Sequence, residues 1–373
     1  MKRTISIKLV TSPEQEARLL LLQTELARAC NHLAGAAAVN RCSNRVKLHH
    51  RVYYTVREAM PALGSQMTCN AVAAVVRSYK SLVSNNPGLR KTDWPLITFK
   101  SSGSVHFDKR TYSIKGKAIS LFTTEGRIIV PMKLGEFQGK YLDIGMPKEA
   151  ELVCRKGRYY FNLVLDFPDP PKRTTGPVAG VDLGENTIAA ISTGKIFGGG
   201  KLRHDRDKHL TLRSRLQRNG SQSARQLLKK VSGREARHVR HVNHEVSKAI
   251  IAEAVGNECG AITMEDLTNI RKRIKAGKRM RSRLHRWAWA QLQAFIAYKA
   301  EAAGIRVEFA NPAYTSQTCS VCGCMGTRER HRFSCTCGNL AHSDLNASRN
   351  LARLGATAVA PTGAVNRPYV GTA

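Results

Sequence analysis

Three acidic residues, two directly after apolar runs and one at a helix start, most constrain the fold of this chain. Asp182 follows residues 178–181 and Glu265 follows residues 261–264, and both runs have the composition of buried strands. Asp344 opens a helical stretch. When a fold brings distant carboxylates together they can bind two divalent cations, which stabilise both the attacking and the leaving oxygen of a phosphodiester. We therefore expect the three side chains to meet in one site.

Each acidic residue also has a simpler explanation when it is taken alone. Asp182 could cap a turn, and Asp344 could cap the helix that it opens. Asp266 is an alternative to Glu265, and because side chains alternate along a strand only one of the two should face the site. Gly180, like Gly184 on the other side of Asp182, would let the backbone approach a ligand closely. The three carboxylates together, on a basic chain, favour a nuclease.

The net charge of this 373-residue chain is +33, from 60 Lys and Arg against 27 Asp and Glu. Such an excess goes far beyond what solubility requires and predicts a polyanionic partner. The hydrophobic content of 42% excludes a disordered chain and allows a sizeable core. No apolar run is long enough to span a bilayer, and the first residues have the pattern of a strand rather than of a signal peptide. We therefore expect a cytoplasmic bacterial protein without a membrane role, which joins the nucleoid when it is bound to DNA.

The N-terminal half has the pattern of a β-module that contains a helical insertion. Residues 1–10 alternate in polarity, and the Ser-Pro-Glu-Gln sequence that follows is a helix start. We place the helical insertion at residues 11–89. Short strands and turns in residues 90–170, together with residues 1–10, fit a small β-barrel or sandwich. The proline-rich residues 166–173 are the best candidate for a linker.

The C-terminal half alternates strands and helices, which is typical of a mixed α/β layer. Two long helices are expected at about residues 207–230 and 234–256, and a last one from Asp344 to about Leu354. The order of the elements brings the three acidic residues to one edge, in a ribonuclease H-type arrangement. This domain takes residues 171–310 and 340–355. Residues 356–373 are expected to be a disordered tail.

A cysteine cluster interrupts this α/β region at residues 311–339. Its members form two close pairs, Cys319 with Cys322 and Cys335 with Cys337. This spacing approximates that of a structural Zn²⁺ site with four thiolate ligands. The second pair has one intervening residue where two are commoner, so Cys324 or His331 could supply the fourth ligand instead.

The residues that follow Glu265 are strongly basic and predict phosphate contacts beside the acidic site. They are Arg271, Lys272, Arg273, Lys275, Arg281 and Arg283. A second basic surface is expected on the helix at about residues 207–230 and just before it, from residues 204–206, Arg213, Arg215, Arg218, Arg225, Lys229 and Lys230.

Four sequence motifs resemble those of the TnpB proteins of bacterial insertion sequences, which are themselves similar to type V CRISPR effectors. The motifs are Gly-Val-Asp-Leu-Gly at 180–184, Thr-Met-Glu-Asp-Leu at 263–267, Thr-Ser-Gln-Thr-Cys at 315–319 and Asp-Leu-Asn-Ala-Ser-Arg-Asn at 344–350. The resemblance implies a RuvC-like nuclease domain carrying a zinc ribbon. It also implies an N-terminal wedge domain (1–10 and 90–170) with a recognition domain (11–89) inserted in it.

The resemblance further implies an RNA-guided DNA endonuclease that acts as a monomer with its RNA. A guide RNA from the transposon would direct cleavage of double-stranded DNA next to a short target-adjacent motif. Asp182, Glu265 and Asp344 would hold two Mg²⁺ ions, and the four paired cysteines a structural Zn²⁺. Three alternatives stay open: a miniature type V CRISPR effector, a guide-free structure-specific nuclease, and a non-enzymatic RNA-guided DNA binder.

Overall fold

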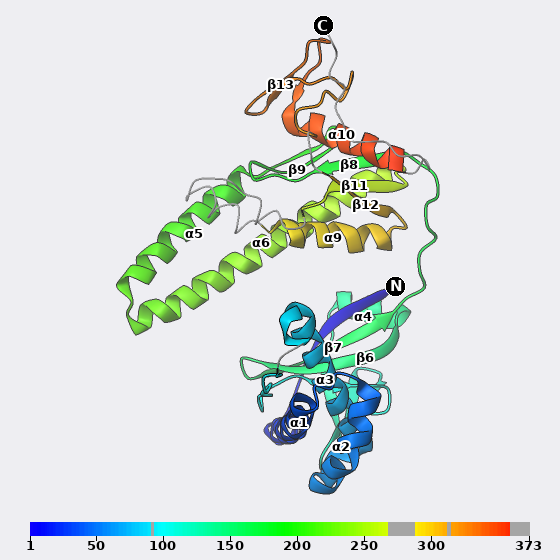
Figure 1. Ribbon diagram of the computed structural model, residues 1–373, viewed down its shortest axis with the longest axis vertical. Coiled ribbons are helices and arrows are strands. Elements are labelled where there is room, and N and C mark those ends of the chain that lie inside the picture. Colours follow the sequence, from blue (N-terminus) through cyan, green and yellow to red (C-terminus); the bar gives the residue numbers. More distant parts are fainter. Residues whose placement is uncertain (91–92, 268–287, 312–314, 359–373) are drawn as a thin grey trace. The chain divides into compact units, whose positions relative to one another are not determined.

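The computed structural model describes residues 1–90, 93–267, 288–311 and 315–358, and the chain divides into two compact units after Pro168 (Figure 1). None of the helices in these ranges combines the length and the apolar character that a membrane span requires. The two units are described separately below.

The N-terminal unit is built on a seven-stranded antiparallel sheet that is nearly closed. Its strand order is β2-β6-β7-β1-β5-β4-β3. The strands are β1 (Lys2–Leu9), β2 (Val105–Phe107), β3 (Tyr112–Lys115), β4 (Ala118–Thr123), β5 (Gly126–Lys133), β6 (Met146–Arg155) and β7 (Arg158–Asp166). The first strand lies centrally, because Lys2 to Lys8 pair with Asp166 to Tyr160 of β7. The barrel-like sheet with a helical insertion that the sequence predicts is confirmed.

Three helices fill the long connection between β1 and β2: α1 (Pro13–Val39), α2 (Arg45–Ala59) and α3 (Gly64–Asn85). The predicted helix start is present. The Ser12 side chain accepts a hydrogen bond from the Gln15 N–H, and the Gln15 side chain accepts one from the Ser12 N–H. Short 3₁₀ segments occupy Pro61–Leu63 and Pro87–Arg90, and α4 (Glu136–Ile144) lies between β5 and β6. Buried side chains from the helices and the sheet form one continuous core in this unit.

The C-terminal unit contains a five-stranded sheet with the order β10-β9-β8-β11-β12. Its strands are β8 (Val178–Asp182), β9 (Thr187–Ile191), β10 (Ile196–Gly198), β11 (Ala261–Glu265) and β12 (Arg306–Ala310). The strands β8, β11 and β12 are parallel, whereas β9 and β10 join by antiparallel pairing. This is the α/β, ribonuclease H-like architecture that the sequence predicts.

Helices cover both faces of this sheet. In Figure 1, α10 (Ser343–Ala358) lies on one face, and α6 (Gln222–Gly256) and α9 (Trp289–Ala302) lie on the other. The helix α5 (Gly200–Asn219) runs antiparallel to α6, and the pair extends well beyond the sheet. The break between them falls at Gly220, whose φ is +65°, and Ser221 then caps α6. This break lies earlier than the predicted boundary between residues 230 and 234, because the polar residues on both sides form no periodic pattern that could locate it.

A small three-stranded sheet, β13 (Thr327–Glu329), β14 (Arg332–Ser334) and β15 (Leu340–His342), precedes α10. Residues 315–342, which contain these strands and the paired cysteines, are called the cysteine ribbon below. The last helix continues to Ala358, three residues into the segment expected to be disordered.

Gly180 fixes how closely α10 approaches the sheet. A Cβ atom at this position would lie 1.8 Å from the Ser348 carbonyl oxygen and 2.5 Å from the Ala352 nitrogen, both in the backbone of α10. The expectation that Gly180 lets a ligand approach the backbone closely is therefore wrong. The space beside this glycine is occupied by the backbone of α10. Through this contact the end of β8 and the start of α10 are held next to each other.

Candidate active site

The three acidic residues predicted to act together lie at neighbouring positions in the fold. Asp182 is the last residue of β8, and Glu265 is the last residue of the adjacent parallel strand β11. Parallel neighbours end at the same edge of a sheet, so both carboxylates reach that edge. Asp344 is the second residue of α10, which packs on β8 and β11. Asp266, the alternative to Glu265, is exposed.

The charges of these carboxylates act on one another. Burial raises the pKa of Asp182 well above its usual range, and the negative charges of Glu265 and Asp344 raise it further. Burial likewise raises the pKa of Glu265, although a hydrogen bond from Thr315 and the charge of Arg328 oppose this. Oxygen ligands that repel each other in a confined site are the donor set that Mg²⁺ accepts, because a bound cation relieves the repulsion. The donor chemistry therefore suits divalent cations, and the ligand atoms of the three carboxylates do not all lie within 4.8 Å of one another.

Hydrogen bonds orient the carboxylates of Glu265 and Asp344. Asp344 Oδ1 accepts from Arg328 Nη2 at 3.1 Å and from Ser343 Oγ at 3.2 Å. Glu265 Oε1 accepts from Thr315 Oγ1 at 3.2 Å. The Glu265 carbonyl oxygen accepts from Gln293 Nε2 at 2.7 Å, which ties the end of β11 to α9. Arg328 therefore places a cationic side chain beside the carboxylates.

Sequence reasoning missed Arg328, Thr315 and Gln293. Thr315 lies inside one of the motifs, and this position alone could have indicated that it belongs to the site. Arg328 is one of many basic residues and nothing in the sequence near it separates it from the others. It reaches Asp344 because β13 belongs to the cysteine ribbon, which is anchored at the start of α10.

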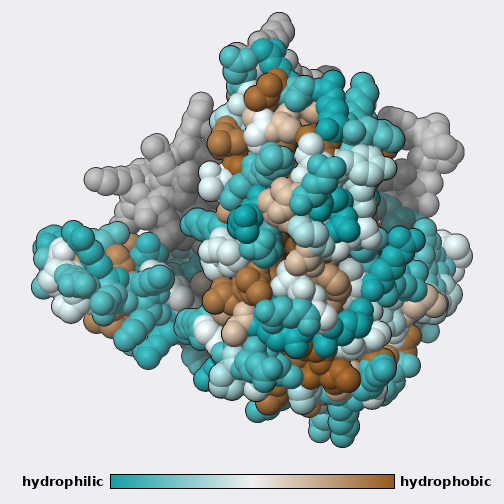
Figure 2. All heavy atoms as spheres, turned by 90° about the horizontal axis from the view of Figure 1, so that it is seen from below, coloured by the Kyte–Doolittle hydropathy of each residue, from teal (hydrophilic) through white to brown (hydrophobic). Residues whose placement is uncertain are grey.

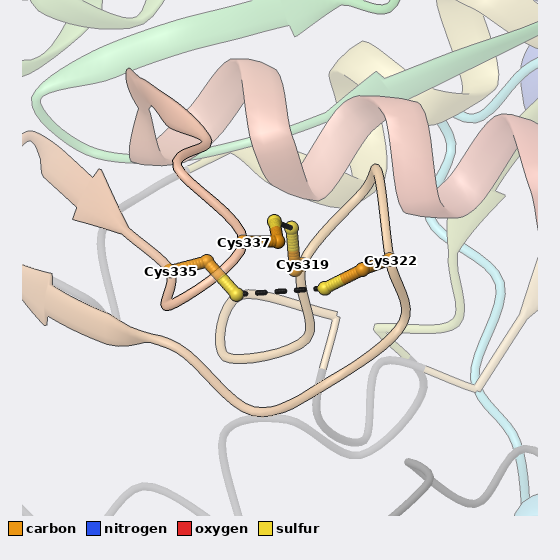
Figure 3. A group of neighbouring side chains, drawn as sticks. All are labelled: Cys319, Cys322, Cys335 and Cys337. Atoms are coloured by element: carbon orange, nitrogen blue, oxygen red, sulfur yellow. Dashed lines mark hydrogen bonds between the residues drawn. The ribbon is translucent and has the colours of Figure 1, made fainter.

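The four paired cysteines converge, as Figure 3 shows. The Sγ atoms of Cys319 and Cys337 are 3.7 Å apart and those of Cys322 and Cys335 are 3.5 Å apart. All four sulfur atoms lie within 4.8 Å of one another, and none forms a disulfide. A tetrahedral site with Zn–S bonds of about 2.3 Å has S···S edges of about 3.8 Å. The donor set and its size therefore fit a structural metal ion, and Cys324 is not part of the group.

Local N–H donors favour a thiolate at Cys319. Burial alone would raise the pKa of Cys319, but the backbone N–H groups of Cys322 and Val321 and the Asn339 side chain outweigh it and lower the pKa to about 6. The Asn339 amide donates to the Cys319 sulfur at 3.2 Å, and the Val321 N–H donates to it at 3.4 Å. A thiolate is the form that binds metal.

Two buried asparagines of α10 join the cysteine ribbon to the acidic site. Asn346 donates to the Thr318 carbonyl at 2.7 Å and accepts the Ser320 N–H at 2.8 Å. Asn350 donates to the carbonyls of Thr315 and Thr318 at 2.9 and 2.6 Å. The motif at residues 344–350 thus combines a carboxylate for the site with amides that hold the ribbon.

The basic residues proposed to contact phosphates after Glu265 lie outside the described residues. They are Arg271, Lys272, Arg273, Lys275, Arg281 and Arg283. The second basic surface falls on α5 and α6, where Arg215, Arg218, Arg225 and Lys229 are all exposed. Figure 2 shows one face of the molecule, which is mainly hydrophilic with small apolar patches.

The fold and the site define a ribonuclease H-like protein with an acidic edge suited to divalent cations. Two family models match: one described as a probable transposase (OrfB_IS605) over residues 162–271, and one described as the Cas12f1-like TNB domain over residues 289–351. The TnpB-like protein MJ0751 of Methanocaldococcus jannaschii is 30% identical over 235 residues, covering 57% of this chain and 81% of that protein. This chain belongs to the TnpB family.

Two further comparisons extend this finding. The CRISPR-associated endodeoxyribonuclease Cas12f1 of Sulfoacidibacillus thermotolerans is 34% identical over 236 residues, covering 53% of this chain and half of the relative's length. The solved structure of the mini-RNA-guided endonuclease CRISPR-Cas_phi3 superposes with a TM-score of 0.57 at 11% identity, covering 95% of this chain and 92% of the other. The latter likeness supports the fold alone.

Proposed function

We propose that this protein is an RNA-guided DNA endonuclease encoded by an IS605-type transposon, and that it cuts double-stranded DNA at a site for two Mg²⁺ ions. The observation that carries the proposal is that Asp182 and Glu265 end adjacent parallel strands, and that the charges of Glu265 and Asp344 both act on Asp182. The names of the relatives agree with it, since one is an endodeoxyribonuclease and another a TnpB-like protein.

The chain's own residues have distinct tasks in this proposal. When bound, two Mg²⁺ ions would supply an activated water and stabilise both oxygens of the in-line displacement. Asp182 provides the carboxylate whose pKa is raised by burial and by the charges of both neighbours. Glu265 and Asp344 flank it in orientations set by Thr315 and Arg328. The Arg328 guanidinium is placed to neutralise charge on the phosphate as it reacts.

The cysteine ribbon would hold a structural Zn²⁺ through Cys319, Cys322, Cys335 and Cys337. This ion has no open coordination position when four thiolates bind it, so it takes no part in the chemistry. Its contribution is to fix β13, and with it Arg328, beside Asp344.

The nucleic-acid partners follow from the charge and from the family. A transposon-encoded guide RNA pairs with the target strand, while basic side chains hold the duplex through its phosphates. In this proposal residues 1–10 and 90–170 act as the wedge domain and residues 11–89 as the recognition domain that reads the target-adjacent motif. One protein chain acts with one RNA.

The test begins with the RNA that co-purifies from a host carrying the native flanking DNA. We expect one structured RNA with a variable end, and Mg²⁺-dependent cleavage of DNA that matches this end. The variant Asp182→Ala should bind the RNA as the wild type does and should not cut. Cleavage that needs no RNA would point to a guide-free nuclease, and RNA binding without any cleavage would point to a DNA-binding repressor.

A further inference from the structure

Two histidines of the cysteine ribbon lie beside Asp344, and neither has a role in the proposed function. His331 lies in the turn between β13 and β14, and His342 ends β15. Their rings stack with centroids 5.3 Å apart and an angle of 21° between their planes. One ligand atom from each histidine and one from Asp344 lie within 4.8 Å of one another. We propose that these three residues form a second metal site, which binds a transition-metal dication and competes with Mg²⁺ for Asp344.

Backbone contacts hold the two histidines in place. The Ser343 N–H donates to the His331 carbonyl at 2.9 Å, and the Ser343 hydroxyl donates to the Arg330 carbonyl at 3.3 Å. His342 pairs with Arg332 across the β14–β15 ladder. The turn that carries His331 is therefore fixed to the start of α10 independently of any side-chain ligand. A preformed arrangement of this kind lowers the cost of binding an ion.

The two carboxylate oxygens of Asp344 have different neighbours. Oδ1 accepts from Arg328 and Ser343, whereas Oδ2 faces His342 Nδ1 at 4.0 Å. His342 Nδ1 accepts the Asp344 N–H at 3.3 Å, so its single lone pair is engaged there and becomes available to an ion only when this hydrogen bond breaks. A lone pair rather than a proton is what a metal ion needs from an imidazole.

The donor chemistry selects the class of ion. Two imidazole nitrogens and one carboxylate oxygen suit Zn²⁺, Ni²⁺ or Co²⁺, whereas Mg²⁺ takes oxygen ligands. Metal bonds of about 2.0–2.2 Å place neighbouring donors about 3–3.5 Å apart, so the Asp344 carboxylate would move toward His342 by about half an ångström or more. His331 is exposed, which gives the ion access.

Competition with Mg²⁺ follows from the shared carboxylate. An ion held by His331 and His342 takes Asp344 Oδ2 and adds positive charge beside the position where Mg²⁺ would bind. Both effects weaken Mg²⁺ binding at Asp182, Glu265 and Asp344. Binding of the transition metal is independent of the proposed nuclease function, whereas the inhibition rests on it.

The first measurement is calorimetric titration of Ni²⁺ into the full-length, zinc-loaded protein without Mg²⁺ or nucleic acid. We expect one Ni²⁺ per chain, and binding weakened at least about 100-fold in His331→Ala. His331 is chosen because its exposed position allows truncation, whereas His342 also caps α10. The matched control is His32→Ala, an exposed histidine on α1, which should bind Ni²⁺ as the wild type does. Absence of wild-type binding, or unchanged binding in His331→Ala, would overturn the site.

The second measurement adds Ni²⁺ to a cleavage reaction at fixed Mg²⁺. Wild-type and His32→Ala proteins should be inhibited at concentrations where His331→Ala still cuts. Equal inhibition of all three proteins would overturn the competition. Absence of cleavage in every protein, with Ni²⁺ binding intact, would instead contradict the nuclease function and leave the metal site standing.

Discussion

At the scale of single residues, Asp182 has the environment of a metal ligand more than that of a structural group. We expect Asp182→Asn to lower Mg²⁺-dependent cleavage by at least about 10²–10³-fold, the loss seen when one electrostatic group of a catalytic site is removed. Binding of the guide RNA should be unchanged, because the substitution leaves the basic surfaces intact. Single-turnover cleavage and a filter-binding titration of the same preparation measure the two quantities. Loss of RNA affinity in parallel with cleavage would contradict this role.

The same substitution should stabilise the metal-free protein. The pKa of Asp182 is raised in the folded state by burial and by its acidic neighbours. Above the ordinary aspartate pKa of about 3.9 the unfolded chain has lost this proton while the folded chain still holds it, so wild-type stability falls as the pH rises. Asparagine has no proton to lose. The difference in Tm between Asp182→Asn and wild type, without Mg²⁺, should therefore grow in favour of the variant from pH 5 to pH 8. A Tm difference independent of pH would count against a raised pKa.

The carboxylates could be predicted from the sequence, and their cationic neighbour could not. Asp182 and Glu265 directly follow buried strands, so the parallel sheet alone places them together. Arg328 depends on a turn and a short strand whose position is set by hydrogen bonds from Asn346 and Asn350 of α10. Such contacts between polar side chains and backbone leave no periodic pattern in a sequence.

At the scale of elements, the packing of α10 on β8 depends on Gly180. Alanine at this position would place its Cβ 1.8 Å from the Ser348 carbonyl, and neither backbone can yield without moving the whole helix. We expect Gly180→Ala to lower the free energy of unfolding by about 3 kcal/mol or more. Denaturant unfolding of the full chain measures this.

A matched glycine gives the opposite expectation. Gly233 lies inside α6, and a Cβ there would meet only the end of the Arg237 side chain at 3.4 Å. Gly233→Ala should therefore stabilise the protein by about 0.5–1 kcal/mol, because alanine is the better helix former. If Gly180→Ala also proved neutral or stabilising, the close packing of α10 on β8 would be wrong.

The cysteine ribbon is the second element whose stability bears on the site. Removal of its metal by a chelator, or the variant Cys322→Ser, should unfold β13–β15 and release Arg328 from Asp344. Cleavage should fall while RNA binding persists, since the N-terminal unit and α5–α6 are unaffected. Zinc content, hydrogen exchange of residues 315–342 and cleavage can be followed together, with Cys324→Ser as the control. Full cleavage by a protein that contains no zinc would contradict the structural role.

Elements differ in how far the sequence reveals them. The helix start at Ser12 is a local pattern, and its capping box is present. The position of β1 between β7 and β5 is not local, since its partners are more than a hundred residues away. Long-range pairing depends on the complementary faces of several strands at once, so the spacing of the strands predicts a barrel or sandwich but not the order of its strands.

At the scale of the whole molecule, the net charge of +33 must be distributed so that nucleic acid neutralises it. Part of it lies on the paired helices α5 and α6, which extend beyond the sheet (Figure 1). Their inner contacts are satisfied within the protein, as in the ion pair of Arg213 and Glu235 at 3.7 Å. Arg215, Arg218, Arg225 and Lys229 stay exposed near the turn at Gly220. Exposed charges of one sign at a protruding end are suited to phosphates.

Replacing these four side chains with glutamine should weaken binding of the guide RNA and make it less dependent on salt. Removing the cation that neutralises one phosphate lowers the slope of log K against log[salt] by about 0.7–0.9, so removing four should lower it by about 3. The control is the variant with Lys at the three arginine positions and Arg at Lys229, which keeps the charge and should keep the slope. Binding titrations between 50 and 200 mM salt (roughly the range over which such phosphate interactions matter) measure both variants. An unchanged slope in the glutamine variant would show that α5 and α6 point away from the RNA, and the charge of the N-terminal unit would then have to account for binding.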